Sequence, residues 1–363
     1  MNRREILRAS GLAAVAAGLA ACSAPDGKNP TSSGPRQQWK MITSWPRDFP
    51  GLGTGASALG ALIGEASGGR LTVKVYGAGE LVPAFEVFDA VGRGVAEMGH
   101  SAAYYWKGKA AAAPFFCAVP FGLNAQEMNA WLYDGGGLKL WRELYAPFNL
   151  LPFPAGNTGV QMAGWFNREI RSVRDLAGLK IRIPGIGGEV MARLGATPVN
   201  LPGAEIFTAL QSGAIDATEW VGPWNDLAFG LHTVARHYYY PGWQEPGPTL
   251  ECMINTSAFE ALPEDLQTLV SACCRAVNEA MLAEFTARNQ DALDTLIREH
   301  GVDVRPLPAD VLSALRRASE QTLEALATSD AMARRCYDSM RAFRAKAQAW
   351  HRISEEAFYQ ARG

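Results

Sequence analysis

Hydrophobic positions along the chain alternate between a two-residue and a 3.6-residue period, a pattern typical of strands separated by helices. In the first part of the chain the helical stretches end at glycines, which stop helices readily. Strands are predicted at residues 38–43, 71–76 and 97–102, and helices at 54–67, 85–92 and 126–145, with a break at glycines 135–137.

The alternation starts again near residue 160. Strands are predicted at 162–167, 179–183, 198–201 and 217–221, and helices at 189–194, 204–211, 263–299 and 308–360. Strands separated by helices favour a parallel sheet with right-handed crossovers. Residues 238–242 are expected to cross back toward the first part. The pattern therefore predicts two α/β lobes joined by several crossings, with a cleft that closes on a ligand.

The N-terminus resembles an export signal. Arg3-Arg4 is typical of twin-arginine signals, and the small apolar run at residues 11–21 is too short to span a bilayer. Residues 19–22 read LAAC, so Cys22 is predicted to be acylated; ordinary cleavage near Ala21 is the alternative. Residues 23–38, rich in Pro, Gly, Ser, Thr and Asn, are predicted to be a disordered tether.

Composition narrows the class of protein. Removal of the first 21 of 363 residues leaves 342, a length that suggests two lobes. The formal net charge of −2 gives no indication of nucleic-acid binding or of a broad anionic membrane patch. No later apolar run reaches membrane-spanning length.

The cysteines do not indicate a metal or redox site, because no pair has zinc or CxxC spacing. A disulfide is possible in an oxidising compartment, but the sequence does not choose its partners, and buried free thiols are the interpretation we favour. The six are Cys22, Cys117, Cys252, Cys273, Cys274 and Cys336.

The most informative stretch is residues 156–247. It contains GNTGVQ at 156–161, KIRIP at 180–184, ATEWVGPW at 217–224 and YYYPGWQEPG at 238–247. These motifs, in this order, resemble the solute-binding proteins of tripartite ATP-independent periplasmic (TRAP) transporters. They are most similar to the branch that captures 2-oxo acids with a metal ion.

The resemblance implies an α/β, two-lobed periplasmic binding protein fold with a hinged cleft and a long C-terminal helix. Lobe I would comprise residues 39–159 and about 246–290, and lobe II residues 160–245 and about 291–330. Residues 331–363 would form a C-terminal helix that packs on the lobes or forms a homodimer.

The resemblance assigns the substrate carboxylate to Arg182, in the KIRIP strand. A planar guanidinium can give a carboxylate two parallel hydrogen bonds and keeps its charge. The alternative is a surface salt bridge, the commonest role of an arginine.

The resemblance also implies a cation site. Its ligands would be Gln161, Glu219, the backbone carbonyl of Trp220, and Glu245, and all-oxygen coordination suits sodium or calcium. One arginine, two glutamates and a monocarboxylate leave a net charge of −2 in a closed cleft, which is costly. A cation is the simplest compensation; protonation of a glutamate or its exposure to solvent are the alternatives.

Aromatic residues are expected to form the walls of the cavity, and only one of Tyr104 and Tyr105 should point inward if strand alternation holds. Asn157 is a candidate ligand donor or, equally, a turn residue beside Gly156. The expected aromatic set is Tyr104, Tyr105, Trp106, Trp220 and Trp243.

Two residues depart from the family pattern. Gln244 stands where another aromatic is expected, and Pro246 where a glycine is usual. The carboxylate is therefore a firmer expectation than the 2-oxo group, and a hydroxy acid or an aromatic carboxylate is the alternative ligand.

The expected function is capture of a small carboxylate in the periplasm, for delivery to the membrane permease subunits of a TRAP transporter. We expect no enzyme activity, because no HExxH or GxSxG motif is present and residues 185–189 lack the GxGxxG spacing of a dinucleotide site. A periplasmic enzyme acting on a carboxylate, in which the two glutamates do acid–base work, and a sensor that reports ligand to a membrane kinase are the alternatives.

Overall fold

The computed structural model describes residues 36–363, of which residues 37–363 form one compact unit. The predicted export signal and the predicted acylation site Cys22 lie outside the described residues. Most of the predicted tether lies outside them too, and its Gln37 and Gln38 already belong to the first strand. Among residues 36–363, no helix combines the length and the apolar character needed to cross a bilayer. The five cysteines of this range are buried and free, as the sequence favoured.

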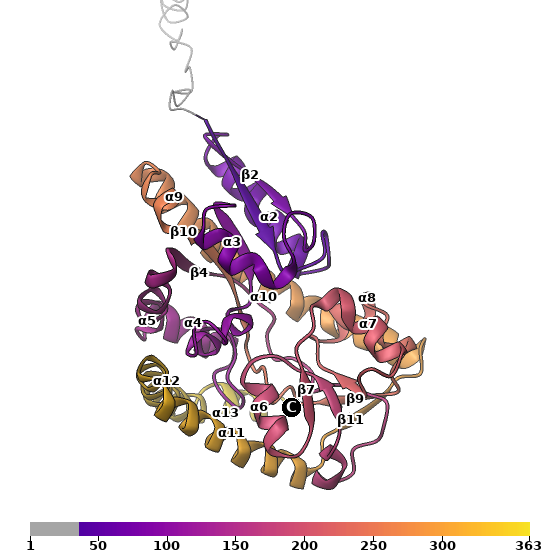
Figure 1. Cartoon of the computed structure of the whole chain (residues 1–363). Helices are drawn as coiled ribbons and strands as arrows, with labels where there is room; N and C mark the ends of the chain where they lie inside the picture. Colours follow the sequence, from indigo (N-terminus) through magenta and orange to yellow (C-terminus); the bar gives the residue numbers. More distant parts are fainter. Residues whose placement is uncertain (1–35) are drawn as a thin grey trace, which may run out of the picture. The chain divides into compact units, whose positions relative to one another are not determined.

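The first sheet has five strands in the order β2-β1-β3-β10-β4. β1 runs parallel to β2 and β3, whereas β10 runs antiparallel to β3 and β4. The strands are β1 (Gln37–Thr43), β2 (Leu71–Tyr76), β3 (Met98–Ser101), β4 (Leu150–Asn157) and β10 (Thr249–Asn255). Three helices pack on this sheet, and in Figure 1 α2 lies along β2: α2 (Leu52–Ala66), α3 (Val87–Gly92) and α10 (Glu264–Arg298).

The second sheet has six shorter strands in the order β11-β9-β5-β8-β6-β7. β6 is parallel to β7 and β8, β9 is parallel to β11, and β5 is antiparallel to both of its neighbours. The strands are β5 (Gly164–Phe166), β6 (Lys180–Arg182), β7 (Thr197–Val199), β8 (Ala217–Thr218), β9 (His237–Tyr240) and β11 (Asp303–Pro306). The helices of this part are α6 (Gly185–Arg193), α7 (Gly203–Gln211) and α8 (Pro223–Ala228).

The prediction of a parallel sheet was only partly right, because both sheets are mixed and the antiparallel strands β4 and β10 were not predicted. β10 is buried at every position, so it lacks the alternation that marks a half-buried strand. β4 contains two prolines, which are tolerated because it is an edge strand. Residues 238–240 do not cross between the two parts: they pair within the second sheet as β9.

The predicted break at the glycines is confirmed, since α4 (Ala125–Tyr133) and α5 (Gly137–Tyr145) are separate helices. The predicted C-terminal helical stretch is divided at Asp330, which accepts a hydrogen bond from the Ala333 N–H at 2.7 Å and caps the second helix. Its parts are α11 (Ala309–Ser329), α12 (Ala331–His351) and α13 (Glu355–Arg362). The remaining short helices are η1 (Ala84–Glu86), η2 (Ala103–Trp106), η3 (Ala113–Phe116), η4 (Ala146–Phe148), η5 (Val173–Leu176), η6 (Leu231–Thr233) and α9 (Thr256–Glu260).

Three long helices tie the two sheets together. α10 packs on β4 and α2 beside the first sheet and on α8 beside the second. α11 packs on α6, and α12 on α4 and α5, so the C-terminal helices extend along both parts (Figure 1). Most apolar residues of the C-terminal stretch are therefore accounted for by packing within the chain, including the buried Val311, Leu315, Leu323 and Met340.

Candidate functional site

β6 ends at Arg182, whose side chain is only 1 % exposed. Its Nη1 donates to a carboxylate oxygen of Glu219 and, at 3.2 Å, to the Glu219 carbonyl. Its Nε donates to the Leu201 carbonyl at 3.1 Å and its Nη2 to the Tyr105 hydroxyl at 3.2 Å. Four of the five guanidinium N–H bonds therefore have acceptors. Arg182 is therefore buried and hydrogen-bonded to Glu219, Leu201 and Tyr105. The alternative role of a surface salt bridge is wrong for this residue.

Strand register brings Glu219 to Arg182. β6 and β8 are parallel neighbours in which Arg182 pairs with Thr218, so both residues lie where these strands end, the edge at which open α/β sheets present binding groups. Burial raises the pKa of Glu219, and the positive charge of Arg182 offsets only part of that rise, leaving it at about 7. Burial lowers the pKa of Arg182, but the charges of Glu219 and its other neighbours outweigh this effect and raise it overall.

Gln161 and Glu245 lie side by side on two loops of this edge. The Gln161 N–H donates to the Glu245 carbonyl at 3.2 Å, and a side chain at Gly242 would come within 2.1 Å of the Gln161 carbonyl, so glycine is required there. Gln161 Nε2 donates to Thr158 Oγ1 at 3.1 Å, which fixes the orientation of the amide. Burial, followed by the charge of Glu219, raises the pKa of Glu245 well above its usual value.

Three oxygens of the predicted cation site have no hydrogen-bond partner within residues 36–363. They are Gln161 Oε1, Glu219 Oε2 and Glu245 Oε2, all buried. A buried carboxylate or amide oxygen without a partner is costly, and a hard cation supplies the missing interaction. In the same range no group of three or more His, Cys, Asp and Glu residues could hold a metal. Two carboxylate oxygens and one amide oxygen are donors of the kind that suits sodium or calcium.

An aromatic wall lies over Arg182. The Trp220 ring centre is 5.3 Å from the guanidinium carbon, within the range of a cation–π contact. Trp45 and Phe49, which come from the loop after β1, pack edge-on against Trp220 with ring centres 6.5 and 6.1 Å away. Trp45 and Phe49 were not predicted as wall residues, because nothing in the sequence links that loop to residue 220.

The expectation that only one of Tyr104 and Tyr105 points inward assumed a strand at these residues, and that assumption is wrong. They belong to the short helix η2, in which strand alternation does not apply. Tyr105 binds Arg182 as described, and burial raises its pKa to about 12. The Tyr104 ring lies 4.7 Å from that of Tyr105, and its Cβ would touch a side chain at Gly185, the first residue of α6.

Two predicted site residues use their polar side-chain groups elsewhere, and the ring of a third packs on another part of the chain. Asn157 Nδ2 donates to the Gly247 carbonyl at 3.1 Å, and its Oδ1 accepts from the Gly159 N–H at 2.9 Å, which is the turn arrangement considered from the sequence. Trp106 donates from Nε1 to the buried Glu251 at 2.5 Å, in the core of the first part. Trp243 packs against Phe121 with ring centres 6.0 Å apart.

Contacts across the cleft hold it closed. Arg182, the last residue of β6 in the second sheet, donates to Tyr105, which follows β3 of the first sheet, and Lys107 forms an ion pair with Glu189. Asn225 Nδ2 donates to the Pro50 carbonyl at 3.0 Å.

The sequence did not indicate that two further buried acids, Asp226 and Glu251, take part in hydrogen-bond networks. Asp226 accepts from Trp165 at 2.9 Å and Tyr238 at 2.7 Å, and burial raises its pKa to about 6. Glu251 accepts from Trp106 and from Tyr145 at 2.8 Å, and burial raises its pKa to about 7. No local motif marks either acid, because their partners come from distant strands and helices.

Within residues 36–363, neither His232 nor His237 forms a hydrogen bond or an ion pair with Asp226. His237 instead lies 3.2 Å from Asp303, and the His232 ring packs against His300 with centres 4.1 Å apart.

The chain is similar to known proteins over most of its length. Residues 43–330 match the profile of the family "Bacterial extracellular solute-binding protein, family 7". A monocarboxylate 2-oxoacid-binding periplasmic protein of Nostoc sp. is 43 % identical over 358 residues, 99 % of this chain and 98 % of that protein.

Two crystal structures of TRAP periplasmic solute-binding proteins are also similar. One, from Pseudoalteromonas atlantica with bound sodium and pyruvate, is 41 % identical, has a TM-score of 0.87 and covers 90 % of this chain and 99 % of its own. The other, from Bordetella bronchiseptica, is 38 % identical, has a TM-score of 0.88 and covers 90 % of this chain and 97 % of its own. It is a mixed-occupancy dimer with copurified calcium and picolinate in one active site and the other site apo.

Proposed function

The chain belongs to the bacterial extracellular solute-binding proteins of family 7, and from this premise we propose that it captures a 2-oxo monocarboxylate of the pyruvate type together with sodium or calcium. Arg182 would hold the carboxylate, and Gln161, Glu219, Glu245 and the Trp220 carbonyl would hold the cation. The proposal is supported by three buried oxygens that have no partner within residues 36–363, on Gln161, Glu219 and Glu245. Of these residues, Glu219 is bound by the buried Arg182 and Glu245 by the backbone of Gln161.

The cation would supply positive charge to the ligand's carboxylate and 2-oxo oxygens when bound. The residues of the chain do the rest. Arg182 retains one N–H without an acceptor among residues 36–363, so a second hydrogen bond to the ligand requires Tyr105 or Glu219 to move. Trp220, Trp45 and Phe49 would exclude water from the ligand's apolar end.

Ligand-dependent thermal unfolding of residues 37–363 tests this function. After dialysis against a chelator, pyruvate with calcium or sodium is expected to raise the midpoint by several degrees, because ligand at about a hundred times Kd adds about 2.7 kcal/mol. 2-Oxobutyrate, lactate, picolinate and succinate are the comparison ligands. A shift with pyruvate alone would remove the cation from the proposal, and no shift with any acid would overturn it.

A second candidate ligand is an aromatic carboxylate. The similar protein from Bordetella bronchiseptica was found with picolinate, and this chain has Gln244 where an aromatic residue is expected. Gln244 Nε2 donates to the Met162 carbonyl at 2.9 Å, leaving Oε1 buried and without a partner within residues 36–363. Such an acceptor favours a hydroxy acid, the other alternative ligand, because lactate carries a hydroxyl donor whereas picolinate at neutral pH carries only acceptors. A larger midpoint shift with picolinate or with lactate than with pyruvate would select the corresponding alternative.

The cleft would open and close between two lobes, residues 39–159 with about 246–290 and residues 160–245 with about 291–330. Support comes from the two separate sheets and from the contacts across the cleft. After export through the twin-arginine signal and acylation of Cys22, the closed protein would deliver its ligand to TRAP permease subunits. We also propose that it performs no chemistry; recovery of pyruvate unchanged after incubation would test this.

A homodimer is proposed through the C-terminal helices. Four large apolar side chains are exposed there, among them Trp350 and Phe358, each 60 % exposed. Replacing both by aspartate is expected to convert the dimer to a monomer in light scattering, since charges at the core of an apolar interface oppose association. The matched control is Leu81→Asp, an exposed apolar residue far along the chain, which should leave the mass unchanged. A monomer mass for the unaltered protein would remove the proposal.

A further inference from the structure

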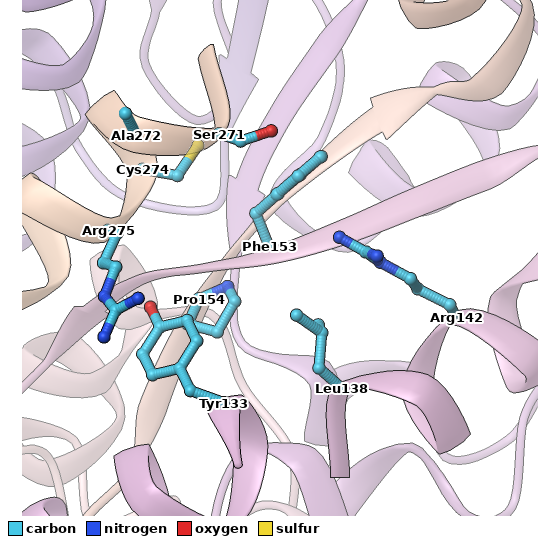
Figure 2. Close-up of a pocket in the computed structure, with 9 residues that line it drawn as sticks. All are labelled: Tyr133, Leu138, Arg142, Phe153, Pro154, Ser271, Ala272, Cys274 and Arg275. Atoms are coloured by element: carbon cyan, nitrogen blue, oxygen red, sulfur yellow. The ribbon is translucent and has the colours of Figure 1, made fainter. Parts of the chain in front are cut away.

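A second cavity lies away from the proposed site, between β4 and the helices α4, α5 and α10. Its volume is about 310 Å³, at the lower end of ligand-sized pockets. Leu138, Phe153 and Pro154 form apolar walls, while Tyr133, Arg142 and Arg275 contribute the polar groups (Figure 2). None of these residues takes part in the network around Arg182.

The two arginines of this cavity lack anionic partners. Within residues 36–363, neither the Arg142 nor the Arg275 side chain forms a hydrogen bond or an ion pair, although ten other arginines of that range form ion pairs. Each stacks on an aromatic wall residue instead: Arg275 lies 4.4 Å from the Tyr133 ring centre and Arg142 lies 5.5 Å from that of Phe153. Stacking holds the guanidinium planes beside the cavity and leaves their N–H groups available.

A third polar group points to a ligand. Tyr133 Oη is buried and has no hydrogen-bond partner among residues 36–363, although it lies in the cavity wall beside Arg275 (Figure 2). An unpaired buried hydroxyl is costly, and an anion held by Arg275 would accept a hydrogen bond from it. The two guanidiniums lie on opposite sides of the apolar walls in Figure 2, so two acidic groups joined by an apolar spacer would match both.

We propose that this cavity binds a small organic dianion with an apolar middle, such as an aliphatic dicarboxylate. One acidic group pairs with Arg275 and Tyr133, the other pairs with Arg142, and the spacer lies against Leu138, Phe153 and Pro154. The site is independent of the 2-oxo-acid site and gives the protein a second ligand of different shape and charge.

Calorimetric titration with pimelate, and with 1,7-heptanediol as the neutral isostere, tests the proposal. The titration is carried out on the Arg182→Met variant, so that binding at the cleft arginine does not contribute. Pimelate is expected to bind at least about ten-fold more tightly than the diol, because the diol cannot form charge-assisted hydrogen bonds with both Arg142 and Arg275.

Variants locate the binding. The double substitution Arg142→Gln/Arg275→Gln is expected to weaken pimelate binding at least about ten-fold, and Tyr133→Phe about three-fold. Arg316→Gln is the control, since Arg316 is exposed and stacks on Phe121 at 4.7 Å without lining the cavity. The proposal is overturned if pimelate fails to bind the Arg182→Met protein, if the diol binds equally well, or if the double variant binds as tightly as the control. Unchanged circular dichroism of each variant excludes loss of folding as the cause.

Discussion

Replacing Arg182 by methionine is expected to weaken pyruvate binding by about 30-fold to several thousand-fold, the equivalent of about 2–5 kcal/mol for truncating one partner of a buried charged hydrogen bond. Calorimetry in saturating calcium measures this loss. The affinity of Arg182→Lys for pyruvate should lie between those of the unaltered protein and Arg182→Met. An ammonium keeps the positive charge but cannot give the carboxylate two parallel hydrogen bonds. Arg174→Met, at an exposed arginine of η5, should bind normally. If Arg182→Met binds pyruvate with unchanged affinity, Arg182 does not hold the ligand's carboxylate.

The fold of Arg182→Met is expected to survive near pH 6, although Arg182 is buried. Arg182 is buried against Glu219, so its removal leaves a buried acid without a cation. The pKa of Glu219 is already raised to about 7, and its carboxyl can therefore be protonated and neutral near pH 6. Circular dichroism at pH 6 should show the native spectrum, whereas the loss of stability should increase toward pH 8.

Without a cation, the stability of the protein is expected to fall as the pH rises from about 4.5 to about 7. The unfolded Glu219 loses its proton near 4.5, whereas the folded one keeps it to about 7, so between these values the folded state holds more protons. The unfolding free energy then decreases by about 1.4 kcal/mol per pH unit for each such group. Burial raises the pKa of Glu245 in the same direction. Urea unfolding across this range, with chelator present, measures the slope.

Calcium is expected to remove most of this slope, because ions bound to Glu219 and Glu245 stabilise their charged forms. Glu251 and Asp226, with pKa values raised to about 7 and about 6, add a slope of the same sign that calcium should not change. The Glu219→Gln/Glu245→Gln variant is the matched control: it should keep the residual slope and lose the response to calcium. A calcium response that persists in this variant would place the cation elsewhere.

The order of strands and helices is encoded locally, and the sequence predicted much of it. The strand at residues 71–76 and the helix break at glycines 135–137 follow from alternation and from glycine, both short-range signals. Elements without such signals were missed. β10 is buried on both faces, β4 carries two prolines, and η2 interrupts the expected strand geometry at Tyr104 and Tyr105.

The sequence by itself determined the family, the α/β class and the residue types that suit a carboxylate and a hard cation, because motif order and side-chain chemistry do not depend on coordinates. Only the tertiary structure decided which polar atoms remain without partners. Asn157 accepts a hydrogen bond from Gly159 in a turn and Trp106 donates to Glu251, whereas Gln161, Glu219 and Glu245 each keep a buried oxygen without a partner within residues 36–363. The tertiary structure also set Arg142 and Arg275 around one cavity. Burial and pairing arise from segments far apart in sequence, so no local pattern could reveal them.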